Sequence, residues 1–123
     1  MPYELTVDHE EDYIRITVIG ELSIEDIEGI IEKTLVIRQK HGIKQILSDH
    51  RSVTALPSII NLYKLGETLA NELFYGVRLA VIGGALHESE KFTETVAANR
   101  GVNVRIFKEE QAARKWLGIE DKN

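Results

Sequence analysis

The chain has 123 residues, the size of one ordinary domain. We therefore expect a single domain over residues 1–118 and a short polar tail at 119–123. Hydrophobic residues make up 43% of the chain and charged residues 28%, which excludes an intrinsically disordered body. The formal net charge of −5 disfavours nucleic acid and anionic membranes as partners, because clustered Lys and Arg bind both.

The chain contains no cysteine, which excludes disulfides, thiolate nucleophiles and cysteine-ligated zinc. The first residues lack the basic region and apolar run of an export signal. The apolar runs are also much shorter than the ~20 residues that span a bilayer. We therefore expect a cytoplasmic protein without a membrane span.

The first half of the chain predicts a hairpin and a helix. Residues 3–7 and 13–19 alternate around a polar turn, with Ile14, Ile16 and Val18 on one face of the second strand. Ser23 followed by acidic residues is typical of a helix N-cap, and Gly42 is typical of a helix end. A helix is therefore expected from Ile24 to His41, and its apolar stripe consists of Ile24, Ile27, Ile31 and Leu35.

The second half predicts alternating strands and helices. A short strand at 45–49, a loop at 50–55, a helix at about 58–74 and an apolar strand at 77–82 come first. A helix at 88–100, a strand at 102–107 and a helix at 109–117 follow, the last with Ala112, Trp116 and Leu117 packing inward. The order ββαβαβαβα predicts an α/β fold, with a mostly parallel sheet, an antiparallel N-terminal strand and right-handed helical crossovers.

Segments along nearly the whole chain resemble one family. They are Gly20-Glu21-Leu22-Ser23, Ile46-Leu47-Ser48-Asp49-His50-Arg51, the strand at 77–82, the segment 92–101, and the ending at 104–107 and 112–117. With these segments in this order, the chain resembles the SpoIIAA-like (STAS/CRAL-TRIO-related) family of small bacterial proteins, mostly of unassigned function. The resemblance implies a cytoplasmic, non-enzymatic, STAS-like module.

The same resemblance concerns a phosphorylation site. Anti-sigma-factor antagonists of this fold carry Asp-Ser-Ser-Gly at the start of the helix after the third strand, and a serine there is phosphorylated. Here the stretch is Leu56-Pro57-Ser58-Ile59-Ile60, so Ser58 is kept and the glycine is absent. This departure puts the phosphorylation switch in doubt, and it leaves open whether Ser52 or Ser58 is modified.

Polar residues follow the predicted parallel strands, and binding sites of such sheets form at the carboxyl ends of the strands. We therefore predict binding residues at that edge: Asp49, His50, Arg51, Ser52, Ser58, Gly83, Gly84 and His87. A hydrolase at Asp49, His50 and His87 is a weaker alternative, because no Gly-x-Ser-x-Gly motif is present and Asp and Ser commonly organise turns. No catalytic residue is assigned. The four histidines lack metal-ligand spacing, so neither a metal nor a cofactor is predicted.

A second alternative is a carrier of an apolar small molecule or lipid. Gly66 falls on the apolar face of its predicted helix, where Gly costs about 1 kcal/mol relative to Ala. Close packing of the helix on the sheet explains such a glycine, and so does a cavity lined by Leu62, Tyr63, Gly66, Leu69 and Leu73.

Taken together, the sequence favours a regulatory module that binds another protein through residues 52–61 and the loop at 83–87. A homodimer is a further alternative, for which Val36 on the solvent side of its helix and the first strand offer contacts.

Overall fold

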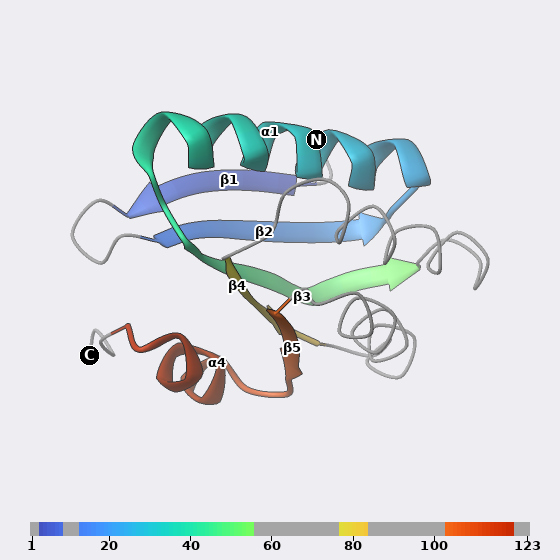
Figure 1. The fold of residues 1–123 in the computed structure, drawn as a ribbon. Coiled ribbons are helices and arrows are strands. Elements are labelled where there is room, and N and C mark those ends of the chain that lie inside the picture. The colour runs from blue at the N-terminus through green and yellow to red at the C-terminus, as the bar shows by residue number, and fades with distance from the viewer. Residues whose placement is uncertain (1–2, 9–12, 56–76, 84–102, 120–123) are drawn as a thin grey trace.

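The computed structural model describes residues 3–8, 13–55, 77–83 and 103–119. In this part of the chain one sheet has the order β1-β2-β3-β4-β5. β1 (Tyr3–Asp8) is antiparallel to β2 (Tyr13–Glu21), whereas β2, β3 (Gln45–Ala55), β4 (Arg78–Ile82) and β5 (Asn103–Phe107) are parallel. Helix α1 (Ile24–His41) lies on one face and α4 (Glu110–Leu117) on the other (Figure 1).

This arrangement confirms the predicted α/β class, the N-terminal hairpin and the mostly parallel sheet. The helices expected at about 58–74 and 88–100 lie outside the described residues.

Helix α1 has the bounds that its capping residues predict. The Ser23 hydroxyl accepts a hydrogen bond from the Asp26 N–H at 3.1 Å, and the Asp26 carboxylate accepts one from the Ser23 N–H at 3.0 Å. This reciprocal capping box satisfies two backbone donors that a helix start leaves without partners. At the other end, Gly42 adopts a left-handed conformation with φ of 67°, and its N–H donates to the Arg38 carbonyl.

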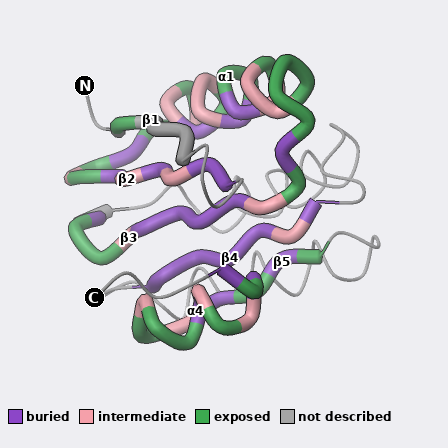
Figure 2. Tube along the Cα trace, turned by 90° about the vertical axis from the view of Figure 1, so that its left-hand side faces the viewer, coloured by how far each residue is buried: buried purple, intermediate pink, exposed green. Residues whose placement is uncertain are grey.

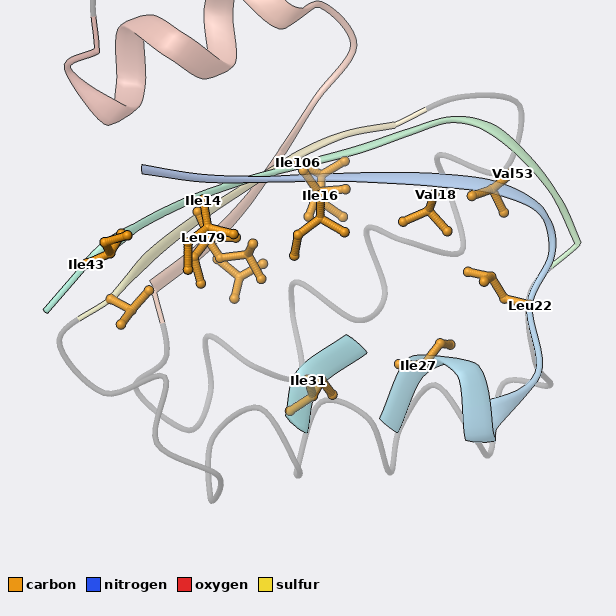
Figure 3. Close-up of a cluster of buried hydrophobic side chains, with 14 residues drawn as sticks. Ile14, Ile16, Val18, Leu22, Ile27, Ile31, Ile43, Val53, Leu79 and Ile106 are labelled. Carbon is orange, nitrogen blue, oxygen red and sulfur yellow. The ribbon is translucent and has the colours of Figure 1, made fainter. Parts of the chain in front are cut away.

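The larger core lies between the sheet and α1 (Figure 3). Ile14, Ile16 and Val18 of β2 point into it, as their alternation predicts, and they meet Ile27 and Ile31 of α1. The expected stripe of α1 is only partly correct, because Thr34 is buried while Ile24 and Leu35 are half-buried.

The smaller core lies between the sheet and α4. Its buried members are Tyr13, Leu47, Ala80, Ile82, Ala113, Leu117 and Ile119. The prediction that Ala112 packs inward is wrong. Ala113 and Leu117, four residues apart, share the buried face, and Ala112 is rotated away by ~100° and exposed. Trp116 is half-buried, with the Arg78 guanidinium 4.4 Å from its ring centroid.

Strand β3 is longer than predicted. The polar run after Asp49 was expected to form a loop, yet β3 continues to Ala55. It does so because β2 also continues, to Glu21, and the two strands pair through Gly20↔Val53 and Glu21↔Ala55. Val53 is buried at the end of the α1-side core, which anchors this part of the strand. Figure 2 shows the buried stretches along β2, β3 and β4 and the exposed outer sides of both helices.

Candidate functional site

The carboxyl ends of β2 and β3 form a two-stranded projection. The pairing of β3 with β4 ends at Asp49↔Ile82, whereas its pairing with β2 continues to Ala55. Among the described strands, residues 50–55 are therefore paired with β2 alone. We call residues 18–21 and 50–55 the β2–β3 ribbon; the two arrowheads end on the same side of the sheet in Figure 1.

A β-bulge marks the start of the ribbon. The paired residues pass from Thr17↔Asp49 to Ile19↔Ser52, so Val18 of β2 lies opposite both His50 and Arg51 of β3. An extra residue of this kind bends a strand and changes the direction of the side chains that follow it. The bulge explains why Val53 joins the same core as Ile46, although a regular strand would place them on opposite faces.

The bulge is fixed by Asp49 and Arg51. Oδ1 of Asp49 accepts hydrogen bonds from the Arg51 backbone N–H at 3.1 Å and from Arg51 Nε at 3.0 Å. Oδ2 accepts from Arg51 Nη2 at 2.8 Å and from Arg15 Nη2 at 3.1 Å. This forked contact matches the planar guanidinium to the planar carboxylate, so Arg51 is held in one orientation although its side chain is 48% exposed.

A second carboxylate, from α4, completes the group. Glu110 accepts hydrogen bonds from Arg15 at 3.2 and 3.3 Å, from Arg51 at 3.1 Å and from Arg114 at 2.9 Å. Arg114 also donates to the Tyr13 hydroxyl at 2.9 Å. We call Arg15, Asp49, Arg51, Glu110 and Arg114 the arginine–carboxylate cluster. Three cations and two anions leave it with one net positive charge, within a chain whose net charge is −5.

The cluster changes the acidity of both carboxyl groups. Burial acts to raise the pKa of Asp49, but the hydrogen bonds from Arg51 and the charges of Arg51 and Arg15 outweigh it, and the pKa is lowered. At Glu110, burial likewise acts to raise the pKa, but the hydrogen bonds and charges of Arg114 and Arg15 outweigh it, and the pKa is lowered. The hydrogen bond to Asp49 is the main reason why the pKa of Arg51 is raised. The cluster is therefore fully ionised at neutral pH.

His50 belongs to the opposite face of the sheet. Its Nε2 lies 2.7 Å from the hydroxyl of Ser48. Ser48 is buried between its strand partners Ile16 and Val81, both members of the α1-side core. Asp49 points instead toward α4, where two arginines occupy both of its oxygens. The hydrolase alternative requires Asp49 and His50 to converge, and they do not. His87 lies outside the described residues.

The remaining predicted binding residues have different outcomes. Ser52 is exposed on the ribbon, opposite Ile19. Gly83 is buried, and its N–H donates to the Phe107 carbonyl at 2.7 Å, so that amide is already used within the sheet. Ser58, Gly84 and His87 are not described. Neither are the five residues predicted to line an apolar cavity, Leu62, Tyr63, Gly66, Leu69 and Leu73.

Sequence reasoning missed Arg15, Ile19, Glu110 and Arg114. The alternation of β2 contained part of the signal, since Arg15 and Ile19 fall on the face opposite Ile14, Ile16 and Val18. Ile19 is 55% exposed. The partners of Arg15 are 34 and 95 residues away along the chain, and no local pattern connects them.

Within residues 3–8, 13–55, 77–83 and 103–119, no three His, Asp or Glu side chains gather as metal ligands would. In the same part of the chain, no helix is long and apolar enough to cross a membrane.

Comparison with known proteins places this geometry in a family. No curated protein matches the chain. An uncharacterized protein from Shewanella loihica PV-4 with a SpoIIAA-like fold is 23% identical, with 94% of this chain and 93% of that one covered and a TM-score of 0.59. The anti-sigma factor antagonist SpoIIAA in its unphosphorylated form is 14% identical, with 97% and 99% covered and a TM-score of 0.62.

The phosphorylated form of the Bacillus cell fate determinant SpoIIAA is 15% identical, with 93% and 98% covered and a TM-score of 0.57. At these identities the three structures establish a shared fold. The SpoIIAA-like family model itself matches residues 13–118, which is most of the chain. The resemblance found in the sequence is thereby confirmed, and the chain belongs to the SpoIIAA-like family.

Proposed function

We propose that this protein is a non-enzymatic regulatory module that binds a partner protein through the β2–β3 ribbon. The observation that carries the proposal is that an exposed apolar side chain and a fixed guanidinium lie on the two neighbouring strands of this ribbon. Ile19 is 55% exposed, and the Arg51 side chain on the neighbouring strand is 48% exposed while both Asp49 oxygens hold it. Arginine is enriched among the residues that dominate binding energy at protein interfaces.

The position and rigidity of the ribbon support the same function. It projects from the carboxyl ends of the parallel strands, where sites of such sheets form. Because the cluster orders Arg51 before any partner arrives, binding does not have to immobilise that long side chain, an entropy cost of ~0.5–1.5 kcal/mol at interfaces. One net positive charge in the cluster favours a partner surface with carboxylates. The family likeness supports the proposal too, since SpoIIAA itself is an anti-sigma factor antagonist.

A photo-crosslinking residue at Ser52 tests the proposal in the cells that make the protein. The matched control is the same residue at Lys44, which is exposed at the amino end of β3. We expect one protein to be captured from position 52 and not from position 44. Equal capture from both positions, or capture from position 44 alone, would contradict the proposed surface.

The captured partner, once purified, allows a quantitative test by calorimetry. Ile19→Lys and Arg51→Glu should each raise the dissociation constant more than tenfold, because one removes the apolar anchor and the other reverses the charge. Lys44→Glu should change it less than twofold. If Lys44→Glu weakens binding as much as Arg51→Glu, which changes the net charge by the same amount, then net charge and not this surface controls the affinity.

A further inference from the structure

The outward row of α1 has a symmetry that the proposed function does not use. At ~100° per residue, Glu25, Gly29, Glu32, Lys33, Val36 and Lys40 lie opposite the buried Ile27, Ile31 and Thr34. We call these six residues the outer row. Gly29 is half-buried, and the others are exposed. Figure 1 shows α1 along one outer side of the molecule, with the sheet beneath it.

The residues of the outer row are spaced equally on both sides of its centre, and the charged residues at corresponding positions have opposite signs. Its successive members are separated by 4, 3, 1, 3 and 4 positions, so its centre falls between Glu32 and Lys33. Each acidic member on one side of this centre has a basic member at the same distance on the other side. Glu25 corresponds to Lys40, and Glu32 corresponds to Lys33. Gly29 corresponds to Val36, so the smallest residue is matched with the exposed apolar one.

We propose that this row is a contact between two copies of the chain, with the two α1 helices antiparallel about a two-fold axis between Glu32 and Lys33. In that arrangement Glu25 meets Lys40 of the second copy at each end of the row, and each Glu32 at the axis lies near both Glu32 and Lys33 of the second copy. The two outer pairs then join opposite charges. A parallel arrangement would bring Glu25 onto Glu25 and Lys40 onto Lys40, which is repulsive.

Val36 and Gly29 distinguish a contact surface from an ordinary solvated helix. Acidic residues early and basic residues late complement the helix dipole in many helices, so charge alone would not require a partner. The dipole does not explain why Val36 is 60% exposed in the same row. Nor does it explain Gly29 in the helix interior, where glycine is the least favourable residue except proline. In the antiparallel pair, Val36 of each copy fits over Gly29 of the other, where the missing side chain permits close approach.

The contact is expected to be weak. A single helix pair falls at the small end of the range of specific interfaces, so a dissociation constant between micromolar and millimolar is appropriate. Its ion pairs are exposed, and salt should weaken it because the Debye length shortens from about 10 Å at 0.1 M to about 3 Å at 1 M. This contact is independent of the β2–β3 ribbon, because Ile19 and Arg51 face the α4 side of the sheet.

Charge-swapped variants of the full chain test the proposal by sedimentation velocity over a range of concentrations. Lys33→Glu with Lys40→Glu makes the row acidic, and Glu25→Lys with Glu32→Lys makes it basic. Each variant alone should be monomeric, with self-association weakened more than tenfold, whereas a mixture should form a one-to-one heterodimer. Circular dichroism verifies that both remain folded, and Lys44→Glu serves as a charge control outside α1.

Two outcomes would overturn the proposal. One is a wild-type protein that stays monomeric at about 1 mM, the upper limit of the expected range. The other is charge-swapped variants that associate on their own as strongly as the wild type.

Cysteine crosslinking tests the orientation, because the chain has no cysteine of its own. Glu32→Cys places two thiols beside the two-fold axis and should form a disulfide-linked dimer under mild oxidation. Val36→Cys should crosslink much more slowly, because its two copies are offset by about 10 Å along the helices. That offset exceeds the ~7 Å limit between the Cα atoms of a disulfide. A Val36→Cys dimer that forms as fast as the Glu32→Cys dimer would rule out the antiparallel arrangement.

Discussion

The two faces of β2 and β3 differ in what they bury. Toward α1, both strands place aliphatic side chains in the larger core, including Ile14, Ile16 and Ile46. Toward α4, the same strands place Tyr13 and Leu47 in the smaller core, and Arg15, Asp49 and Arg51 form ion pairs there. The hydrophobic effect is non-directional, whereas forked ion pairs require a defined orientation of both groups. The α1 face therefore buries the larger apolar core, and the α4 face in addition fixes the orientation of a surface side chain.

Helix α4 is held at both ends by polar contacts. At its start Glu110 is bound by three arginines. At its end Arg78 donates to the Trp116 carbonyl, and Gln45 Nε2 donates to the Leu117 carbonyl at 2.6 Å. These donors satisfy carbonyls that a helix end leaves without partners. An eight-residue helix would be marginal by itself, so its position depends on these contacts and on Ala113 and Leu117 beneath it.

The largest expected effect comes from the α1-side core. Ile46→Ala removes a fully buried side chain from a central strand and should lower the free energy of unfolding by about 3–4 kcal/mol. Urea unfolding followed by circular dichroism measures the loss. Ile19→Ala is the matched control on the same sheet and should cost less than about 0.5 kcal/mol, because that side chain is exposed. Similar losses for both variants would contradict the assigned burial.

A smaller effect is expected from the arginine–carboxylate cluster. Glu110→Gln removes the charge that joins Arg15, Arg51 and Arg114, and it should cost about 1–2 kcal/mol, since the group is only partly buried. Fluorescence of Trp116, the only tryptophan of the chain, should report the change on α4. Glu109→Gln is the control, because the Glu109 side chain makes no capping hydrogen bond. If Glu110→Gln has the same free energy of unfolding as the wild type, the cluster does not stabilise the fold.

The smallest effect is a difference in pH dependence. The folded pKa values of Asp49 and Glu110 lie below their unfolded values of about 3.9 and 4.3. Their contribution to the free energy of unfolding is therefore complete above about pH 5 and is lost as the pH falls through the folded pKa values. Thermal unfolding between pH 7 and pH 3 should show a shallower loss of stability in Asp49→Asn/Glu110→Gln than in the wild type. If the stability of the variant and of the wild type depends on pH in the same way, the pKa values of the two carboxylates are not lowered by folding.

The sequence predicted the fold better than the site, for physical reasons. The bounds of α1 follow from local signals, the Ser23 capping box and Gly42, and both are present in the structure. The length of β3 does not, because Val53 becomes a strand residue only by pairing with Gly20, more than thirty positions away. Asp49 and Arg51 were predicted as binding residues from their place after a strand. The bulge beside them and the contact with Glu110 arise only in three dimensions.

Hydrogen exchange of the protein with and without its crosslinked partner tests whether the β2–β3 ribbon is the partner surface. The β2–β3 ribbon, residues 18–21 and 50–55, should show amide exchange slowed more than tenfold on binding. Residues 78–82 of β4 should be unchanged, and so should the outer row of α1. Protection confined to α1, or no change in the ribbon at saturating partner, would contradict the ribbon as the partner surface.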